Sequence, residues 1–137
     1  MNHAPIVSFD DEPLILVDEQ NRVKGYLDKA ACHVGDGILH RAFSIFLFDR
    51  QGRLLMQKRA DSKLLWGGYW SNTVCSHPRK GEDEATATAR RLADELHTAA
   101  DLTYLFRFQY QARFGDVGSE NELCAVYAGL LQEPYAP

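Results

Sequence analysis

The feature that most constrains this chain is an alternating run of side chains in its last third. In "YLFRFQYQARF", residues 104–114, every second side chain of an extended strand points to the same face, and Leu105 alone breaks the alternation. A "GDVGS" turn follows, and "ENELCAVYAGLL" predicts a further strand. The residues predicted to share the aromatic face are Tyr104, Phe106, Phe108, Tyr110, Ala112 and Phe114.

One helix is clearly marked, by "EDEATATARRLADELH" at residues 82–97. Its predicted apolar stripe consists of Ala85, Ala89, Leu92 and Leu96, at positions i, i+4, i+7 and i+11. A second face carries Glu84, Thr88, Arg91 and Glu95. That face is either the solvent side of the helix or, beside a cleft, a surface suited to a phosphate with Mg²⁺.

The remaining chain predicts shorter strands. "PLILVDEQNRVKGYLDK" indicates two strands joined at Gln20-Asn21, and "RAFSIFLFDRQGRLLMQKR" indicates a hairpin around residues 49–52. The apolar run "AFSIFLF" is typical of a strand covered on both faces, and "WGGYWSNTVC" indicates a turn into another strand. Strands on either side of one helix predict a single α/β or α+β domain over residues 1–137.

Composition excludes several classes of function. The net charge is -4 and no Lys/Arg cluster forms a basic face, so no nucleic-acid partner is expected. No apolar run approaches the roughly 20 residues of a membrane helix, and the N-terminus does not resemble a signal peptide. Three cysteines, an odd number without close pairing, argue against a disulfide framework. A cytoplasmic protein without a membrane partner is expected.

Potential ligands and acid–base groups fall on shared strand faces. Cys75 and His77 share one face in "SNTVCSHP", and Glu120, Glu122 and Cys124 share another in the last strand. Such residues are either inert, as a buried thiol beside surface charges, or part of a site. The histidines His33 and His40 could converge from a loop, and imidazoles with carboxylates are typical ligands of zinc, manganese or iron. A buried Tyr110 would need a hydrogen-bond partner.

Together these motifs resemble a known family. The spacing Ser76-x5-Glu82-x7-Arg90-Arg91-Leu92-x-Asp94-Glu95-x-His97 resembles a degenerate Nudix box, in which the usual signature has glycine at both ends and glutamate at Arg91. "SNTVCSHP", "ENELC" and "ACH…ILHRAFS" resemble the cysteine, glutamate and histidine motifs of the type 1 isopentenyl-diphosphate isomerases, a Nudix branch that shares the arginine. The resemblance runs from about Pro13 to Gln132.

This resemblance implies a Nudix-type mixed β-sheet sandwiched by helices and interconversion of isopentenyl and dimethylallyl diphosphate. It implies catalysis by Cys75, Glu122 and Tyr110, and binding of the diphosphate by Lys29, Arg59, Lys63 and Arg91. It further implies a divalent ion (Mn²⁺, Zn²⁺ or Mg²⁺) held by His33, His40, His77, Glu120 and Glu122, and a diphosphate-bridging Mg²⁺ held by Glu95. A monomer or weak dimer is expected.

Two departures from the family leave other functions open. The sequence stops at "LQEPYAP", whereas the family continues with a segment that supplies a last helix and an aromatic residue, so a truncated domain is expected. His97 stands where the Nudix box has glycine. The alternatives are a Nudix diphosphate hydrolase, which the arginine at position 91 disfavours, and a non-catalytic protein that binds a metal or a prenyl diphosphate.

Overall fold

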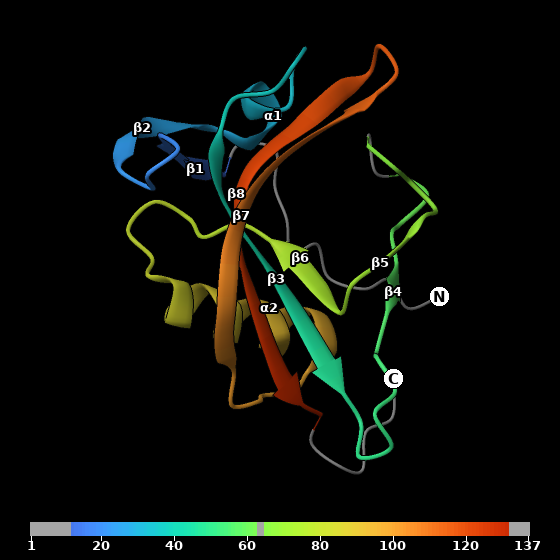
Figure 1. Ribbon diagram of the computed structural model, residues 1–137. Helices are drawn as coiled ribbons and strands as arrows, with labels where there is room; N and C mark the ends of the chain where they lie inside the picture. Colours follow the sequence, from blue (N-terminus) through green and yellow to red (C-terminus); the bar gives the residue numbers. More distant parts are fainter. Residues whose placement is uncertain (1–11, 63–64, 132–137) are drawn as a thin grey trace.

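A mixed sheet forms the body of the protein in the computed structural model, which describes residues 12–62 and 65–131 (Figure 1). The sheet order is β2-β1-β3-β8-β7, and β6 also pairs with β3. Its strands are β1 (Pro13–Val17), β2 (Val23–Asp28), β3 (His40–Phe48), β6 (Val74–Ser76), β7 (Thr103–Phe114) and β8 (Gly118–Leu130). The other elements are α1 (Lys29–Cys32), α2 (Glu84–Leu96), β4 (Gln57–Lys58) and β5 (Trp70–Ser71). The expected mixed sheet and its long helix are confirmed.

The apolar strand β3 lies in the middle of the sheet, as its sequence predicts. It runs parallel to β8 along its whole length, while β1 and then β6 pair with its other edge. The hairpin predicted after it is correct only at the turn, where Gly52 has a φ of 79° and Phe48 bridges to Leu54. Beyond that bridge the prediction is wrong, because Gln57 pairs with Ser71 of β5 instead of with β3.

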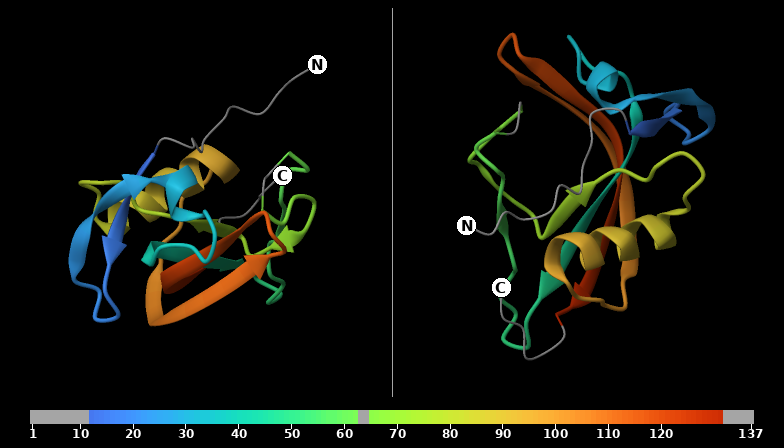
Figure 2. Two further views of the ribbon diagram at one scale, coloured as in Figure 1. Left: turned by 90° about the horizontal axis from the view of Figure 1, so that it is seen from above. Right: turned by 180° about the vertical axis from the view of Figure 1, so that it is seen from behind.

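Helix α2 covers one face of the sheet, as the view from behind shows (Figure 2). Its Leu92 and Leu96 pack with Phe43, Ile45 and other apolar residues of β3, β6 and β8 into the main hydrophobic core. Burial of this apolar surface is the main source of stability for a sheet with a single covering helix.

The apolar stripe predicted for α2 is wrong in its first half. Ala85 and Ala89 are exposed, whereas Thr88 and Arg91 are buried on the inner side. Both polar side chains have partners there, because the Thr88 hydroxyl donates to the Glu84 carbonyl at 2.8 Å and the Arg91 guanidinium pairs with Glu95 at 2.9 Å. The polar face of α2 therefore is not its solvent side.

The ends of α2 follow local rules. Asp83 caps the helix by accepting from the Thr86 N–H at 2.7 Å. His97 ends it with a φ of 53°, in the left-handed region that favours glycine. The helix geometry thus explains why a Nudix box has glycine at this position, and His97 occupies it at a cost in backbone strain.

The alternation predicted for β7 holds from Phe106 to Phe114, but a bulge interrupts it near the start of the strand. The register shifts between Tyr104 and Phe106, where Leu105 breaks the pattern, so the prediction that Tyr104 shares the aromatic face is wrong. Tyr104 lies instead on the α2 side, with its ring 5.7 Å from that of Tyr127 and below the Arg107 guanidinium. Phe106 and Phe108 remain on the other face, 52% and 41% exposed.

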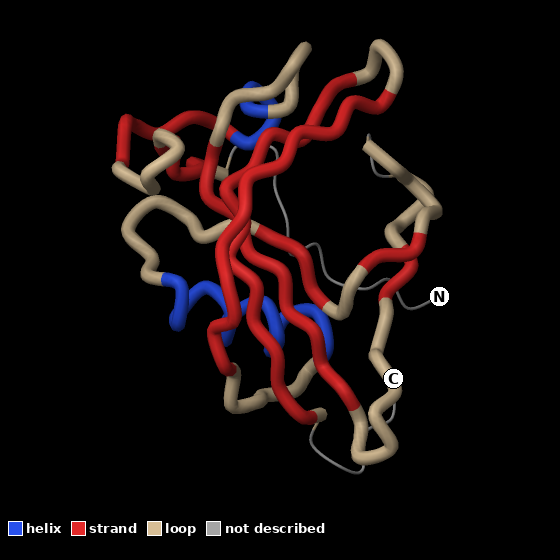
Figure 3. The backbone as a smooth tube through the Cα atoms, in the orientation of Figure 1, coloured by secondary structure: helices blue, strands red, loops and turns tan. Residues whose placement is uncertain are grey.

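The segment between β3 and β6 forms an arm that stands apart from the main sheet (Figure 3). It contains the small β4–β5 sheet, and its turn is closed by the Arg59 N–H, which donates to the Tyr69 carbonyl at 2.7 Å. In the part of the chain that the structure describes, neither helix is long and apolar enough to cross a membrane.

Candidate active site

Strand register places three polar residues side by side in the centre of the sheet. His40, the first residue of β3, is paired with Glu122 of β8, and Glu122 is paired in turn with Tyr110 of β7. Directly paired residues point to the same face of a sheet, so all three side chains emerge at one level. His77 joins them because it directly follows β6, whose Ser76 is paired with Phe43.

Three histidines converge at this point from three different segments. The ligand atoms of His33, His40 and His77 all lie within 4.8 Å of one another. The Nδ1 atoms of His33 and His40 lie 2.8 and 2.7 Å from the carbonyl oxygens of Lys29 and Ile38. These contacts place the ring hydrogen on Nδ1 and leave Nε2 as a free lone pair, as in metal-binding histidines. The predicted convergence of His33 and His40 is therefore confirmed.

The charges around these rings fit a cation. His40 is fully buried and its Nε2 atom has no hydrogen-bond partner, which is costly unless a ligand occupies that side. Glu122 Oε2 lies 3.2 Å from His77 Nε2 and 3.8 Å from His40 Nε2. Burial, together with neighbouring positive groups, holds the pKa of His77 well below its usual range, and burial also lowers the pKa of His33. Neutral imidazoles beside a carboxylate suit a divalent metal.

Two carboxylates share one phenol in the same cluster. The Tyr110 hydroxyl lies 2.6 Å from Glu120 Oε2 and 2.6 Å from Glu122 Oε1. A hydroxyl has one hydrogen, so it donates to one oxygen, and the other short contact needs a proton on the carboxyl. Burial and the charge of Glu122 raise the pKa of Glu120, which favours that proton, and the same burial and charges raise the pKa of Tyr110. The cluster can therefore hold and move a proton.

A cavity of about 870 Å³ opens beside the cluster, and Cys75 of β6 lines it together with Tyr110, Glu120 and Glu122. The thiol is exposed to the cavity. Burial by the cavity walls raises the pKa of Cys75, and the two carboxylates add to this effect, whereas hydrogen bonds from Ser44 and Asn72 oppose it. Cys75 and His77 are thus brought to one cavity, as their shared face predicts.

Basic residues line the same cavity. Lys29 at the start of α1, Arg59 in the arm and Arg91 in α2 all face it. These are three of the four residues expected to bind a diphosphate, and the fourth, Lys63, lies outside the described residues. Glu95 is not among the lining residues. It forms an ion pair with Arg91, which does line the cavity.

Phe108 of β7 forms an aromatic wall of the cavity, on the face that the sequence predicts it to share with Tyr110. Two other lining residues have no counterpart in the predictions from sequence, namely Trp66 in the arm and Ser44 of β3, which lies between two cysteines. Of these, only Ser44 carries a readable signal, because it is the single polar residue in the apolar run "AFSIFLF". Trp66 has a φ of 51°, which depends on a turn that the sequence does not specify.

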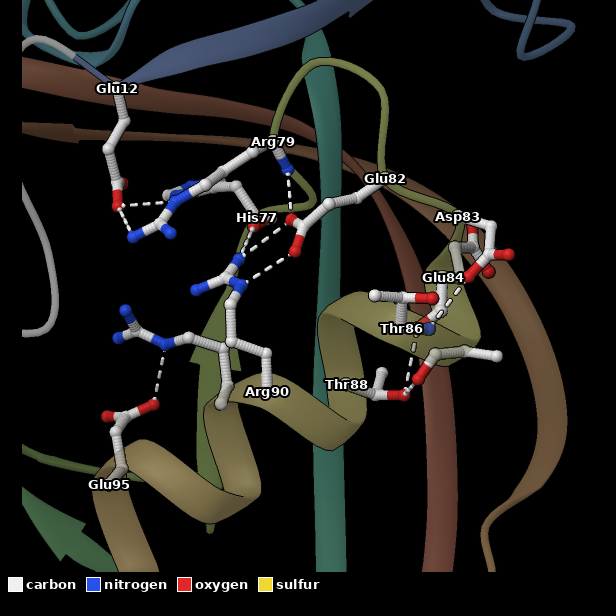
Figure 4. A network of polar contacts seen from close by, with 12 residues as sticks. Glu12, His77, Arg79, Glu82, Asp83, Glu84, Thr86, Thr88, Arg90 and Glu95 are labelled. Atoms are coloured by element: carbon white, nitrogen blue, oxygen red, sulfur yellow. Dashed lines mark hydrogen bonds and ion pairs between the residues drawn. The ribbon is translucent and has the colours of Figure 1, made fainter.

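A second charged network contacts the backbone at His77 (Figure 4). Arg79 donates to Glu12 and, through its backbone N–H, to Glu82 at 2.7 Å. Arg90 forms an ion pair with Glu82 at 2.7 Å and donates to the His77 carbonyl at 3.5 Å. This network, made of Glu12, Arg79, Glu82 and Arg90, fixes the loop that follows His77 to the N-terminus of β1 and to α2.

The family model of the NUDIX domain matches residues 38–137. The crystal structure of DR0079 from Deinococcus radiodurans has a similar fold, with a TM-score of 0.70 over 92% of this chain and 77% of that one. Because the two sequences are only 23% identical, this likeness concerns the fold alone.

Curated relatives are more similar in sequence. Isopentenyl-diphosphate Delta-isomerase 1 of Photorhabdus laumondii is 42% identical over 90% of this chain and 71% of its own length. Isopentenyl-diphosphate Delta-isomerase of Serratia proteamaculans is 47% identical over 88% of this chain and 67% of its own length. Isopentenyl-diphosphate Delta-isomerase 2 of Aromatoleum aromaticum is 44% identical over 87% of this chain and 62% of its own length. The chain thus spans about two thirds of the length of these relatives.

Proposed function

The chain belongs to the isopentenyl-diphosphate Delta-isomerase family of NUDIX domains, and on this premise we propose that it interconverts isopentenyl and dimethylallyl diphosphate. The observation that carries the proposal is the single cavity shared by the Cys75 thiol and the Glu122–Tyr110 pair, beside three converging histidines. These groups are the acid–base set that moving a double bond requires.

The reaction adds a proton to the terminal alkene carbon and removes one from the carbon on the other side of the branch point. An unactivated alkene is a weak base, so protonation needs a well-placed acid and yields a tertiary carbocation. The cation must be kept from water and must lose its proton to a base at the neighbouring carbon. One acid and one base, each facing its own carbon, are therefore needed, and the substrate gains one proton and loses one.

We assign the acid to Glu122 with Tyr110, and the base to Cys75. The short contacts of the Tyr110 hydroxyl with both carboxylates support proton storage and delivery at that wall. Cys75 as thiolate would accept the proton that the carbocation loses, becoming a thiol. Burial raises the pKa of Cys75 and opposes that thiolate, whereas the hydrogen bonds from Ser44 and Asn72 favour it. Phe108 and Trp66 also line the cavity, and their ring faces would attract a developing positive charge.

Two cations complete the proposal. A Mn²⁺, Zn²⁺ or Mg²⁺ ion would be held by the three histidines with Glu120 and Glu122, and would supply positive charge that increases the acidity of the groups it contacts. Lys29, Arg59 and Arg91 would bind the diphosphate oxygens, with Lys63 as the fourth basic residue. Glu95 would hold a Mg²⁺ ion on the diphosphate, turning away from Arg91 to do so.

The test is proton exchange with solvent. The metal-loaded protein is incubated with isopentenyl diphosphate in deuterated water, and the dimethylallyl product is analysed for deuterium by mass spectrometry. The proposal expects deuterium in a methyl group of the product, because the added proton comes from a group that exchanges with water. Absence of deuterium, with folded protein that has bound metal, would contradict it.

The same incubation separates the two alternatives. A diphosphate hydrolase would release phosphate. The sequence disfavours hydrolysis, because Arg91 stands where the usual Nudix box has glutamate. A non-catalytic protein would bind isopentenyl diphosphate without exchange. The cytoplasmic location and the monomeric or weakly dimeric state stay predictions.

A further inference from the structure

Three neighbouring strands present a row of two thiols and one hydroxyl on the cavity side of the sheet. Ser44 lies on the central strand β3, where its register partner on β6 is Cys75. On the other side, β8 contributes Cys124 to the same face. All three side chains line the cavity. The acid–base roles assigned above use only Cys75 of this row.

The Ser44 hydroxyl bridges the two sulfurs. Its Oγ atom lies 3.6 Å from Cys75 Sγ and 3.4 Å from Cys124 Sγ, both within range of hydrogen bonds to sulfur. A hydroxyl donates one hydrogen and accepts others, so Ser44 can donate to one sulfur while it accepts from the second. Cys124 is only 2% exposed, and its nearest other acceptor, the Ala125 carbonyl, is farther away at 3.8 Å.

These distances favour one direction for the chain of hydrogen bonds. A buried S–H group needs an acceptor, and the Ser44 oxygen is the nearer one for Cys124. The Ser44 hydrogen is then left for Cys75, whose sulfur faces the cavity. Hydrogen bonds of this kind favour one side-chain rotamer, and for Cys75 the Ser44 hydroxyl adds to a second directional contact, the hydrogen bond from Asn72.

We propose that Ser44 is a positioning residue that acts through Cys75: its hydroxyl, oriented by Cys124, holds the Cys75 sulfur in the rotamer that faces the substrate carbon. This inference rests on the proposed function only for its effect on turnover. The orientation of the sulfur is a structural property of the protein and can be measured without any reaction.

The sequence context supports a specific role for this hydroxyl. Ser44 is the only polar residue in "AFSIFLF", a run whose strand lies in the middle of the sheet. An alanine would serve a purely packing role at such a position without a polar group to satisfy. The serine therefore has a cost in this strand that its contacts with the two thiols offset.

The experiment compares Ser44→Ala with Ser44→Thr, which keeps the hydroxyl. The control is Thr98→Ala, because Thr98 does not line the cavity and its hydroxyl donates to the Ala99 carbonyl at 3.4 Å. Loss of one hydrogen bond should lower the kcat of Ser44→Ala about three- to tenfold with KM unchanged, since the basic residues that bind the diphosphate are intact. Ser44→Thr should recover most of the loss, and Thr98→Ala should match the parent protein.

A second measurement keeps the two proposals separate. Crystal structures of the parent protein and of Ser44→Ala should show the Cys75 sulfur in one rotamer in the parent and in more than one in the variant. If the parent protein exchanges no deuterium, the proposed function fails, while the rotamers still decide the role of Ser44. An unchanged single rotamer, or an unchanged kcat in an active protein, would overturn the positioning role.

Discussion

One cluster of charged residues contains His77 and another contacts its backbone, and the two differ in how their charges are matched. In the network of Glu12, Arg79, Glu82 and Arg90, each carboxylate faces a guanidinium group. In the cluster of His33, His40, His77, Glu120 and Glu122, two carboxylates share one phenol beside three histidines, and burial lowers the pKa of His33 and His77.

The difference indicates what each cluster is for. Matched charges stabilise one another, so the arginine network is structural, and its one buried atom without a hydrogen-bond partner among the described residues is Arg90 Nη1. The histidine cluster has an excess of negative charge and a buried, unpartnered His40 Nε2 atom, and these features cost stability until a cation is bound. Both clusters contain glutamates. They support the structure where their nearest partners are arginines, and they form the candidate site where their nearest partners are a phenol and histidines.

The largest expected effect is on catalysis, and it should be confined to the histidine cluster and its cavity. Glu122→Gln and Cys75→Ala should each lower isomerase activity by about 10²–10⁴-fold, since each removes one proton-transfer group. Steady-state rates with isopentenyl diphosphate measure this loss. Glu82→Gln, measured under conditions where it is folded, serves as the control and should retain its rate. Either variant keeping more than about a tenth of the activity, a loss below 1.4 kcal/mol in barrier, would contradict the assigned role.

Metal binding should stabilise the protein through the histidine cluster alone. At a free metal concentration about 100 times the Kd, the free energy of unfolding should rise by about 2.7 kcal/mol. His77→Asn should lose this gain, whereas Arg79→Gln, although less stable at the outset, should keep it. Chemical unfolding of metal-free and metal-loaded samples measures the gain. An equal gain in His77→Asn would show that the metal binds elsewhere.

The arginine network should contribute to stability in a pH-dependent way. Burial opposes ionisation of Glu82, but the ion pair with Arg90 and the Arg79 N–H outweigh it, and the pKa of Glu82 is lowered below 4.5. Its stabilisation is therefore complete above pH 4.5, the value of the unfolded chain, and is lost as the pH falls through the lower folded pKa.

Glu82→Gln should accordingly lower the free energy of unfolding by about 2 kcal/mol at pH 7, because it leaves Arg90 poorly paired. Urea unfolding at a series of pH values should show the difference from the parent protein shrinking below pH 4.5. A difference that stays constant down to the lowest pH would mean that charge is not the cause.

The smallest effect should come from an exposed pair outside both clusters. Arg113 and Asp36 form an ion pair at 2.6 Å, but their side chains are 53% and 79% exposed. Solvent screens such pairs, so Arg113→Gln should change the free energy of unfolding by less than about 1 kcal/mol. A larger loss in urea unfolding would show that the β7–β8 turn is held to the α1 loop chiefly by this contact.

Local pattern was sufficient for much of this fold. Helix α2 and the strands β1, β2, β3, β7 and β8 lie where periodicity and turn residues predict them, because each rule depends only on neighbours in sequence. The errors have tertiary causes. Ala85 and Ala89 are exposed because the buried side of α2 accommodates Thr88 and Arg91 with their own partners. Tyr104 changes face at a bulge that pairing with β8 creates.

The sequence by itself determined which residue types were available, and through the family motifs it indicated a cysteine, three histidines and two glutamates as one set. Only the tertiary structure decided that they meet, because the parallel register of β3 with β8 sets His40 beside Glu122 and the turn after β6 brings His77 to both. It also decided that Ser44 lies between two thiols, since strand pairing joins residues that are 31 and 80 positions apart in the chain.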